Sequence, residues 1–291
     1  MDSEQRLADS LGVSLTLHTI QINNHTIRYA KAGEGDPVLL IHGGTLGWGW
    51  WHPNIAELAK HFTVYAIDLP GGGRSSHVDF RHVDFERDFV DTTEEFISQL
   101  NIRPVSLIGA SVGGWVATKI ALRKKIPIKK LVLVDFLGLT GYRRMRELVL
   151  GIHPIAQLFV RTIFRPSRDN PQMESMLRDV FVNKAHALKA EFVDYFYDTM
   201  ARSHNLLFIS KTSSVEGRKA LLLQRDDLQS ITQPTLIMWG EQDSLMPLAK
   251  YAPFFSHFPR AQVLIVKDAG HIPSIEKSEE FNAAIIRFLS K

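Results

Sequence analysis

The sequence predicts an α/β protein built on a doubly wound, mostly parallel β-sheet. Short apolar runs rich in branched residues recur along the chain, with helical stretches between them. Within each run the apolar residues are continuous rather than alternating, which is typical of strands that helices cover on both faces. One long stretch without a strand pattern interrupts this order before the order resumes.

An antiparallel hairpin is expected ahead of the parallel strands. In the segment LTLHTIQINNHTIRYAKAG, residues 15–33, apolar and polar residues alternate on both sides of the turn sequence INNH. Alternation is typical of strands with one covered face, and two such runs around a short turn predict a hairpin. We therefore expect this hairpin at one edge of the sheet.

Six strands and the helices between them complete the expected core. The strands are expected in PVLLIHG from Pro37, FTVYAIDLPG from Phe62, PVSLIGAS from Pro104, KLVLVDF from Lys130, PTLIMWGEQD from Pro234 and AQVLIVKDAGH from Ala261. Helices are expected over residues 84–100, from residue 111 and at the end of the chain. The last helix has the clearest apolar spacing, with Phe281, Ala284, Ile285, Phe288 and Leu289. Strands that alternate with helices favour a parallel sheet between two helical layers.

The alternation of strand and helix breaks between residues 138 and 230. Segments such as MRELVLGIHPIAQLFVRTIF and HALKAEFVDYFYDTMARSHNLLFI have helical patterns, and the sheet pattern resumes after them. We therefore interpret residues 138–230 as a helical cap inserted between two strands. Residues 1–137 and 231–291 form the core domain in this interpretation.

Composition limits the classes of function. Of the 291 residues, 45% are hydrophobic and 22% are charged, which is typical of a folded globular protein. The chain contains no cysteine, so disulfides, thiolate metal sites and cysteine nucleophiles are excluded. Its first residues do not resemble a signal peptide, and no apolar run reaches the roughly 18 residues that span a bilayer. We therefore expect a cytoplasmic protein without stable membrane insertion.

The basic residues do not predict a nucleic-acid partner. The net charge is +3, and the densest basic cluster, RKKIPIKK at residues 123–130, contains no aromatic residue. A nucleic-acid surface would combine a basic stripe with aromatic side chains. The cluster is better explained as a helix end, where cations favour the helix dipole, followed by a strand.

The most informative motif is GASVG, Gly109 to Gly113. Its serine, Ser111, lies where an apolar strand pattern ends and a helical pattern begins. Reactive groups gather at such junctions in doubly wound sheets. A G-x-S-x-G turn holds its serine in a strained conformation with the hydroxyl exposed, and its glycines avoid collisions with neighbouring backbone. Ser111 is therefore the expected nucleophile.

A serine nucleophile needs a base, and the base needs an acid that orients it. His271, in DAGHIPSIE, follows the last expected strand and is the favoured base, whereas His42 in LLIHGG is expected to support its own loop. Asp243, which ends the preceding strand, is the favoured acid. Asp135, at the end of KLVLVD, is the main alternative because it could reach the histidine from the neighbouring strand.

Two backbone N–H groups are candidates for an oxyanion hole. Val112 directly follows Ser111, and Gly44 lies in the loop after LLIHGG. Both positions can present an N–H to a substrate carbonyl, and a glycine lets the backbone approach that carbonyl closely. The chemistry expected here needs neither a metal nor a cofactor.

With Ser111, Asp243 and His271 in this order and HGG upstream, the sequence resembles the α/β-hydrolase superfamily. The resemblance covers nearly the whole chain, because VYAIDLPGGGRSS is similar to the family's D-x-P-G-x-G-x-S segment and the helical insertion occupies the usual cap position. Gly72 departs from the pattern, since many relatives have a histidine or an aromatic residue there, so we expect atypical packing. Relatives that dehalogenate or open epoxides have an aspartate in place of Ser111, which argues against both reactions.

Aromatic residues near these motifs are candidates for the substrate pocket. In TLGWGWW we expect at least one of the three tryptophans to pack in the core and another to line the acyl site; they are Trp48, Trp50 and Trp51. The cap contributes three tyrosines, for which the core or a helix surface is the simpler explanation: Tyr142, Tyr195 and Tyr197.

Together these residues predict a cofactor-free serine hydrolase that cleaves carboxylic esters of apolar, modest-sized molecules through an acyl-enzyme on Ser111. The expected partner is a small-molecule ester. The same triad could act on carbon–carbon bonds or lactones, and the sequence does not separate these reactions. The alternative outside enzymes is a ligand-binding receptor on the same scaffold. The oligomeric state is left open.

Overall fold

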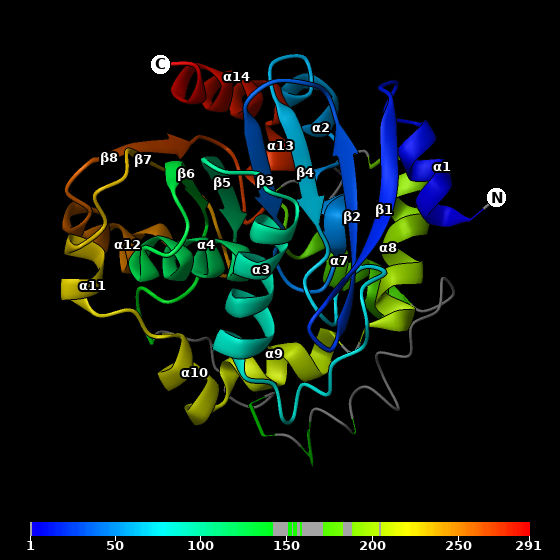
Figure 1. The fold of residues 1–291 in the computed structure, drawn as a ribbon. Coiled ribbons are helices and arrows are strands. Elements are labelled where there is room, and N and C mark those ends of the chain that lie inside the picture. The colour runs from blue at the N-terminus through cyan, green and yellow to red at the C-terminus, as the bar shows by residue number, and fades with distance from the viewer. Residues whose placement is uncertain are drawn as a thin grey trace.

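An eight-stranded sheet with helices on both faces forms the centre of the molecule (Figure 1). The structure is a computed structural model, and it describes residues 2–141, 151–152, 154–155, 158, 171–182, 188–203 and 205–291. The strands are β1 (Leu15–Ile22), β2 (His25–Ala32), β3 (Pro37–Ile41), β4 (Thr63–Ile67), β5 (Val105–Ala110), β6 (Ile128–Val134), β7 (Thr235–Gly240) and β8 (Ala261–Val266).

The strand order is β1-β2-β4-β3-β5-β6-β7-β8. The pairs β1–β2 and β2–β4 are antiparallel, and every pair from β4–β3 to β7–β8 is parallel. The expected hairpin is therefore confirmed at one edge, and the doubly wound, mostly parallel sheet is confirmed with all six of its further strands. The carboxyl ends of the parallel strands consequently meet at one edge of the sheet, where ligands bind in such folds.

Helices follow the strands as the sequence predicts. The helices of the core are α1 (Ser3–Asp9), α2 (Ile55–Leu58), α3 (Thr92–Gln99), α4 (Val112–Arg123), α12 (Leu248–Tyr251), α13 (Pro273–Glu276) and α14 (Ser278–Leu289). The helix expected over residues 84–100 consists of a π-helical segment, η2 (Glu86–Asp91), that continues into α3. Two 3₁₀ segments complete the core: η1 (Gly47–Trp51) and η3 (Ala252–His257).

The sheet separates two hydrophobic layers because side chains alternate along each strand. On β3, Leu39 and Ile41 join the layer under α3 and α4, whereas Leu40 joins the layer under α2, α13 and α14. On β5, Leu107 and Ile108 divide in the same way. Continuous apolar runs are therefore needed to bury both faces, which is the physical reason the sequence pattern identifies these strands.

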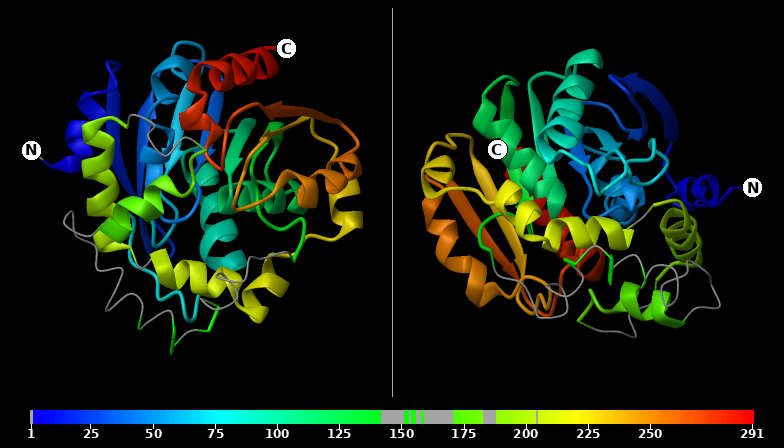
Figure 2. Two further views of the ribbon diagram at one scale, coloured as in Figure 1. Left: turned by 180° about the vertical axis from the view of Figure 1, so that it is seen from behind. Right: turned by 90° about the horizontal axis from the view of Figure 1, so that it is seen from below.

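Helices fill the described part of the chain between β6 and β7. They are α7 (Pro171–Arg178), α8 (Ala190–Arg202), α9 (Asn205–Ser213), α10 (Val215–Leu221) and α11 (Arg225–Gln229). Figures 1 and 2 show α8 alongside α1, and α9 with α10 below the sheet. Tyr142, one of the three expected cap tyrosines, lies outside the described residues. Within the described part of the chain, every helix is too short or too polar to span a membrane.

Candidate active site

Ser111 occupies the turn between β5 and α4. Its backbone has φ 51° and ψ −118°, a left-handed conformation that a non-glycine residue adopts only under strain. The Ser111 N–H donates to the Val134 carbonyl at 2.9 Å, and the Ser111 carbonyl accepts from the Leu137 N–H at 3.1 Å. Hydrogen bonds to the last residue of β6 and to the chain just after it therefore hold both the N–H and the carbonyl of the strained residue.

The two glycines of the motif make this turn possible. A Cβ atom on Gly113 would lie 2.2 Å from the Ile41 carbonyl oxygen, and one on Gly109 would lie 2.3 Å from the Gly113 carbonyl oxygen. Both distances are far below van der Waals contact. Any side chain at either position would push α4 away from the strands, as the sequence motif predicts.

The loop after β3 passes directly over Ser111. A Cβ atom on Gly43 would lie 2.9 Å from Ser111 Cβ and 2.8 Å from Trp50 Cη2. Gly44 follows with φ 55°, a conformation that glycine adopts without steric cost. Gly44 is predicted from the sequence, but Gly43 is not. The lack of a side chain on Gly43 is what lets this loop lie against Ser111.

His271 and Asp243 form a buried hydrogen-bonded pair. His271 Nδ1 lies 2.8 Å from Asp243 Oδ2, and both residues are buried. Asp243 Oδ1 accepts two backbone N–H groups, from Leu245 at 2.7 Å and from Met246 at 2.8 Å. Burial alone raises the pKa of Asp243, but the charge and hydrogen bond of His271 outweigh it and lower that pKa. Asp243 is therefore ionised, and its carboxylate fixes the imidazole.

The loop that carries His271 is tied to the segment after α7. The His271 N–H donates to the Val180 carbonyl at 2.9 Å. Glu276 accepts from the Gly270 N–H at 2.8 Å with one oxygen and from the Val182 N–H at 2.9 Å with the other. The role of Glu276 is not predictable from the sequence, because the Gly270 and Val182 N–H groups become neighbours only in the folded molecule.

Asp135 reaches the same place from β6. Its Oδ1 accepts the Gly240 N–H at 3.0 Å. One polar side-chain atom of each of Asp135, Asp243 and His271 lies within 4.8 Å of those of the other two. Among the described residues these three form the one group whose spacing would suit a metal ion. Within this group, His271 Nδ1 is hydrogen-bonded directly to Asp243 Oδ2. The arrangement fits an imidazole oriented by an acid.

The tryptophans of η1 divide between the core and the site. Trp48 and Trp51 are fully buried in the core, whereas the Trp50 indole meets the His271 ring edge-on, with 6.4 Å between ring centroids. Tyr195 of α8 is also core, because its ring packs on Trp48. A Cβ atom on Gly49 would lie 2.3 Å from the Tyr195 ring, so the glycine between Trp48 and Trp50 makes room for that ring.

These residues lie at the carboxyl edge of the parallel sheet. Ser111 follows β5, Asp135 follows β6, Asp243 follows β7 and His271 follows β8. The model of the alpha/beta hydrolase fold family matches residues 36–278 of the chain. The chain belongs to the α/β-hydrolase family.

Curated relatives of this chain include a dienoic acid hydrolase and a methyl ester esterase. It is 25% identical over 268 residues to the 2-hydroxy-6-oxo-6-(2'-aminophenyl)hexa-2,4-dienoic acid hydrolase of Metapseudomonas resinovorans, covering 91% of this chain and 87% of the relative. It is 28% identical over 264 residues to the pimeloyl-[acyl-carrier protein] methyl ester esterase of Yersinia pseudotuberculosis, covering 88% and 94%. Both relatives are hydrolases, which supports the prediction that this chain is an enzyme.

A solved structure confirms the fold of this hydrolase. The meta-cleavage product hydrolase of Pseudomonas fluorescens IP01 superposes with a TM-score of 0.77 at 22% identity. The match covers 94% of this chain and 97% of that one. At this identity the likeness concerns the fold alone.

Proposed function

We propose that this hydrolase cleaves carboxylic esters through an acyl-enzyme on Ser111. The observation that carries the proposal is the buried 2.8 Å hydrogen bond between His271 Nδ1 and Asp243 Oδ2. With its proton on Nδ1, the neutral imidazole keeps Nε2 free to accept another proton. The strained turn at Ser111 supports the nucleophile, since it lies at the same edge of the sheet as this base.

The first half of the reaction forms the acyl-enzyme. Ser111 Oγ attacks the ester carbonyl carbon while His271 Nε2 takes the hydroxyl proton. The N–H groups of Val112 and Gly44 hold the developing oxyanion, and ionised Asp243 stabilises the imidazolium. His271 then gives the proton to the leaving alcohol as the carbon–oxygen bond breaks.

The second half releases the acid. Water attacks the acyl carbonyl while His271 Nε2 accepts its proton, and the same N–H groups hold the second oxyanion. The imidazolium returns the proton to Ser111 Oγ as the acyl bond breaks. The carboxylic acid leaves, and the enzyme regains its starting state.

The substrate is a modest-sized, apolar ester in this proposal. Trp50 supports an apolar acyl site, because its indole ring meets the His271 imidazole and its edge lies against the Gly43 backbone over Ser111. We assign residues 138–230 to a cap that limits access to this site. The hydrogen bonds from the segment after α7 to the His271 loop support that assignment.

Cleavage of carbon–carbon bonds is the second candidate. The relative from Metapseudomonas resinovorans is a dienoic acid hydrolase, and the likeness covers most of both chains. The same base and oxyanion hole could serve a vinylogous diketone, whose carbonyl carbon water or Ser111 would attack. The relative from Yersinia pseudotuberculosis, a methyl ester esterase, favours the ester reaction.

Replacement of Ser111 tests the proposal. We expect Ser111→Ala to lower kcat/KM for p-nitrophenyl acetate at least about a thousandfold, because the acyl-enzyme can no longer form. Ser256→Ala, at an exposed serine far along the chain in η3, is the matched control and should keep wild-type turnover. Near-normal turnover by Ser111→Ala would overturn the proposal.

A substrate panel separates the candidates. Short-chain esters, a lactone and a vinylogous diketone are compared at equal enzyme concentration. Preference for the ester by kcat/KM supports the proposal, whereas turnover of the diketone alone would transfer the function to carbon–carbon cleavage. Many product molecules per protein chain distinguish an enzyme from a ligand-binding receptor.

A further inference from the structure

The carboxyl group of Asp135 is buried beside the proposed triad. Asp135 directly follows β6 and is 1% exposed. Its Oδ1 accepts the Gly240 N–H, whereas its Oδ2 is buried and meets no hydrogen-bond donor among the described residues. A buried oxygen without a partner is costly, and that cost disappears if the oxygen carries a proton that it can donate.

Asp243 offers the acceptor that such a proton needs. One polar side-chain atom of each of Asp135, Asp243 and His271 lies within 4.8 Å of those of the other two. Asp243 already accepts three hydrogen bonds, one from His271 Nδ1 and two from backbone N–H groups, and each of them favours its ionised form. Two adjacent buried carboxyl groups do not both ionise at neutral pH, so the proton belongs on the group with fewer donors.

We propose that Asp135 is a protonated carboxylic acid that donates a hydrogen bond from Oδ2 to Asp243 and thereby positions the acid of the triad. The inference rests on the proposed function, in which Asp243 orients His271. Asp135 touches neither the substrate nor the reacting atoms, so it is a positioning residue. Both of its oxygens are then used, one as an acceptor for Gly240 and one as a donor to Asp243.

The charged groups around Asp135 favour its neutral form. Burial raises the pKa of Asp135 well above its usual range, and the negative charge of Asp243 raises it further. Glu276, on α13, acts in the same direction, while the Gly240 N–H acts in the opposite one. His271 is the remaining titratable group of the cluster, and its Nδ1 is engaged by Asp243. The hydrogen bond of His271 is therefore directed to Asp243 and not to Asp135.

Two substitutions at Asp135 separate a neutral donor from an ionised acid. Asp135→Asn retains an acceptor for Gly240 and a neutral N–H donor for Asp243, so we expect kcat for p-nitrophenyl acetate at pH 7 to stay within about threefold of wild type. Asp135→Ala removes both groups and should lower kcat about tenfold or more. Asp243→Asn is the reference for loss of the ionised acid, with an expected fall of about ten-thousandfold.

A second readout does not depend on activity. Because the folded pKa of Asp135 is raised above that of an unfolded aspartate, its contribution to stability is complete below about pH 3.9 and is lost as the pH rises through the folded pKa. Asparagine does not titrate. The Tm of Asp135→Asn relative to wild type should therefore increase from pH 4 towards pH 8. Asp268→Asn, at an exposed aspartate, is the matched control and should show no such trend.

The outcomes distinguish this inference from the proposed function. Loss of activity in Asp135→Asn as severe as in Asp243→Asn would overturn the inference, because it would mean that Asp135 must be ionised. Wild-type activity in Asp135→Ala would show that Asp135 does not position Asp243. A Tm difference between Asp135→Asn and wild type that does not change with pH would show that Asp135 is not protonated. If the protein turned over no ester at all, the proposed function would fail while the Tm series still decided the protonation of Asp135.

Discussion

His42 shows how one buried side chain shapes the loops around the site. Its Nε2 accepts the Leu69 N–H at 2.9 Å, and its Nδ1 donates to the Gly43 carbonyl at 3.0 Å, so the expected loop-supporting role is confirmed. A Cβ atom on Gly72 would lie 2.8 Å from His42 Cε1. The imidazole therefore fills the space that a larger residue at position 72 would need. The departure of Gly72 from the family pattern has this steric reason.

The neutral form of His42 predicts a loss of stability in acid. Burial lowers the pKa of His42 to about 4, from 6.5. Since the unfolded chain binds the proton first, stability falls as the pH drops from about 6.5 to about 4, by roughly 3 kcal/mol from this group. His42→Gln keeps an acceptor for the Leu69 N–H but does not titrate. The free energy of unfolding of this variant, measured by urea denaturation, should therefore fall less between pH 6.5 and pH 4 than that of wild type.

The control for this comparison is His18→Gln, at an exposed histidine of β1. That variant should lose as much stability in acid as wild type does. Equal acid losses in His42→Gln and wild type would contradict the neutral, hydrogen-bonded His42 described above.

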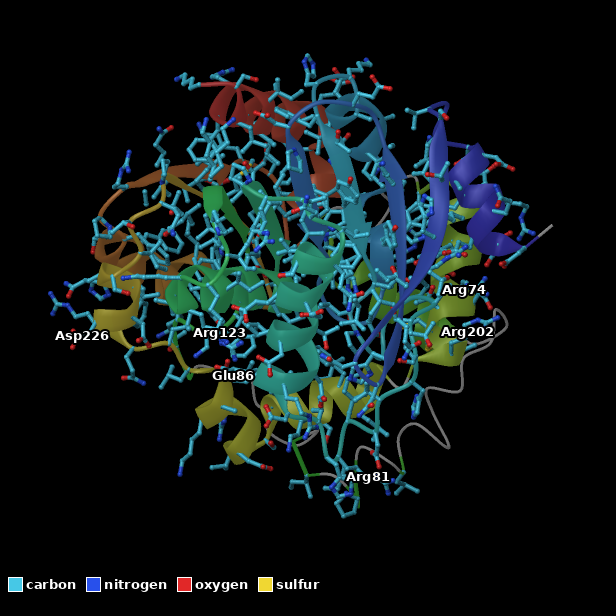
Figure 3. All side chains as sticks on the ribbon, in the orientation of Figure 1. Arg74, Arg81, Glu86, Arg123, Arg202 and Asp226 are labelled. Carbon is cyan, nitrogen blue, oxygen red and sulfur yellow. The ribbon has the colours of Figure 1, made fainter. Side chains whose placement is uncertain are left out.

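Among the elements, α1 joins helix α8 to the sheet. Glu4 is buried and accepts from Arg28 of β2 with both oxygens, and Trp48 Nε1 donates to it at 2.9 Å. Arg74 pairs with Asp2 and with Asp198 of α8, and Figure 3 shows Arg74 beside that helix, which ends at Arg202. These contacts connect the first helix to the hairpin, to η1 and to α8. A more distant ion-pair cluster around Arg123 and Glu86 lies on the other side of the sheet (Figure 3).

Burial decides which of the α1 ion pairs matters for stability. Glu4→Ala leaves the Trp48 indole N–H without an acceptor and removes the carboxylate partner of the Arg28 guanidinium, so we expect it to lower the free energy of unfolding by about 2 kcal/mol. Arg6→Ala removes the more exposed pair with Asp194 and should cost at most about 1 kcal/mol. Urea denaturation at pH 7 measures both. Equal losses in the free energy of unfolding of Glu4→Ala and Arg6→Ala would contradict the larger contribution expected of the buried Glu4.

At the scale of the whole molecule, topology explains why much of the site is predictable from the sequence. Each strand of the parallel sheet is a continuous apolar run, and the carboxyl ends of these strands meet at one edge. Reactive residues just after such runs therefore lie at the same edge of the sheet. Ser111 and His271 can be selected in this way before any coordinates are known.

Other features of the site depend on tertiary contacts that a linear pattern does not encode. Asp135 and Asp243 both end strands, and β6 and β7 are neighbours, so strand position alone cannot rank the two acids. Only the geometry distinguishes them, because His271 Nδ1 bonds to Asp243. Glu276 is equally hidden, since its acceptor role depends on Val182, 94 residues away.

An acyl-enzyme on Ser111 is detected by mass spectrometry of protein that is quenched in acid during turnover of p-nitrophenyl acetate. We predict one acetyl group per chain, located on Ser111 after proteolysis and absent from Ser111→Ala. Turnover by the wild-type protein without any acetyl adduct, or an acetyl group on another residue in place of Ser111, would contradict this mechanism.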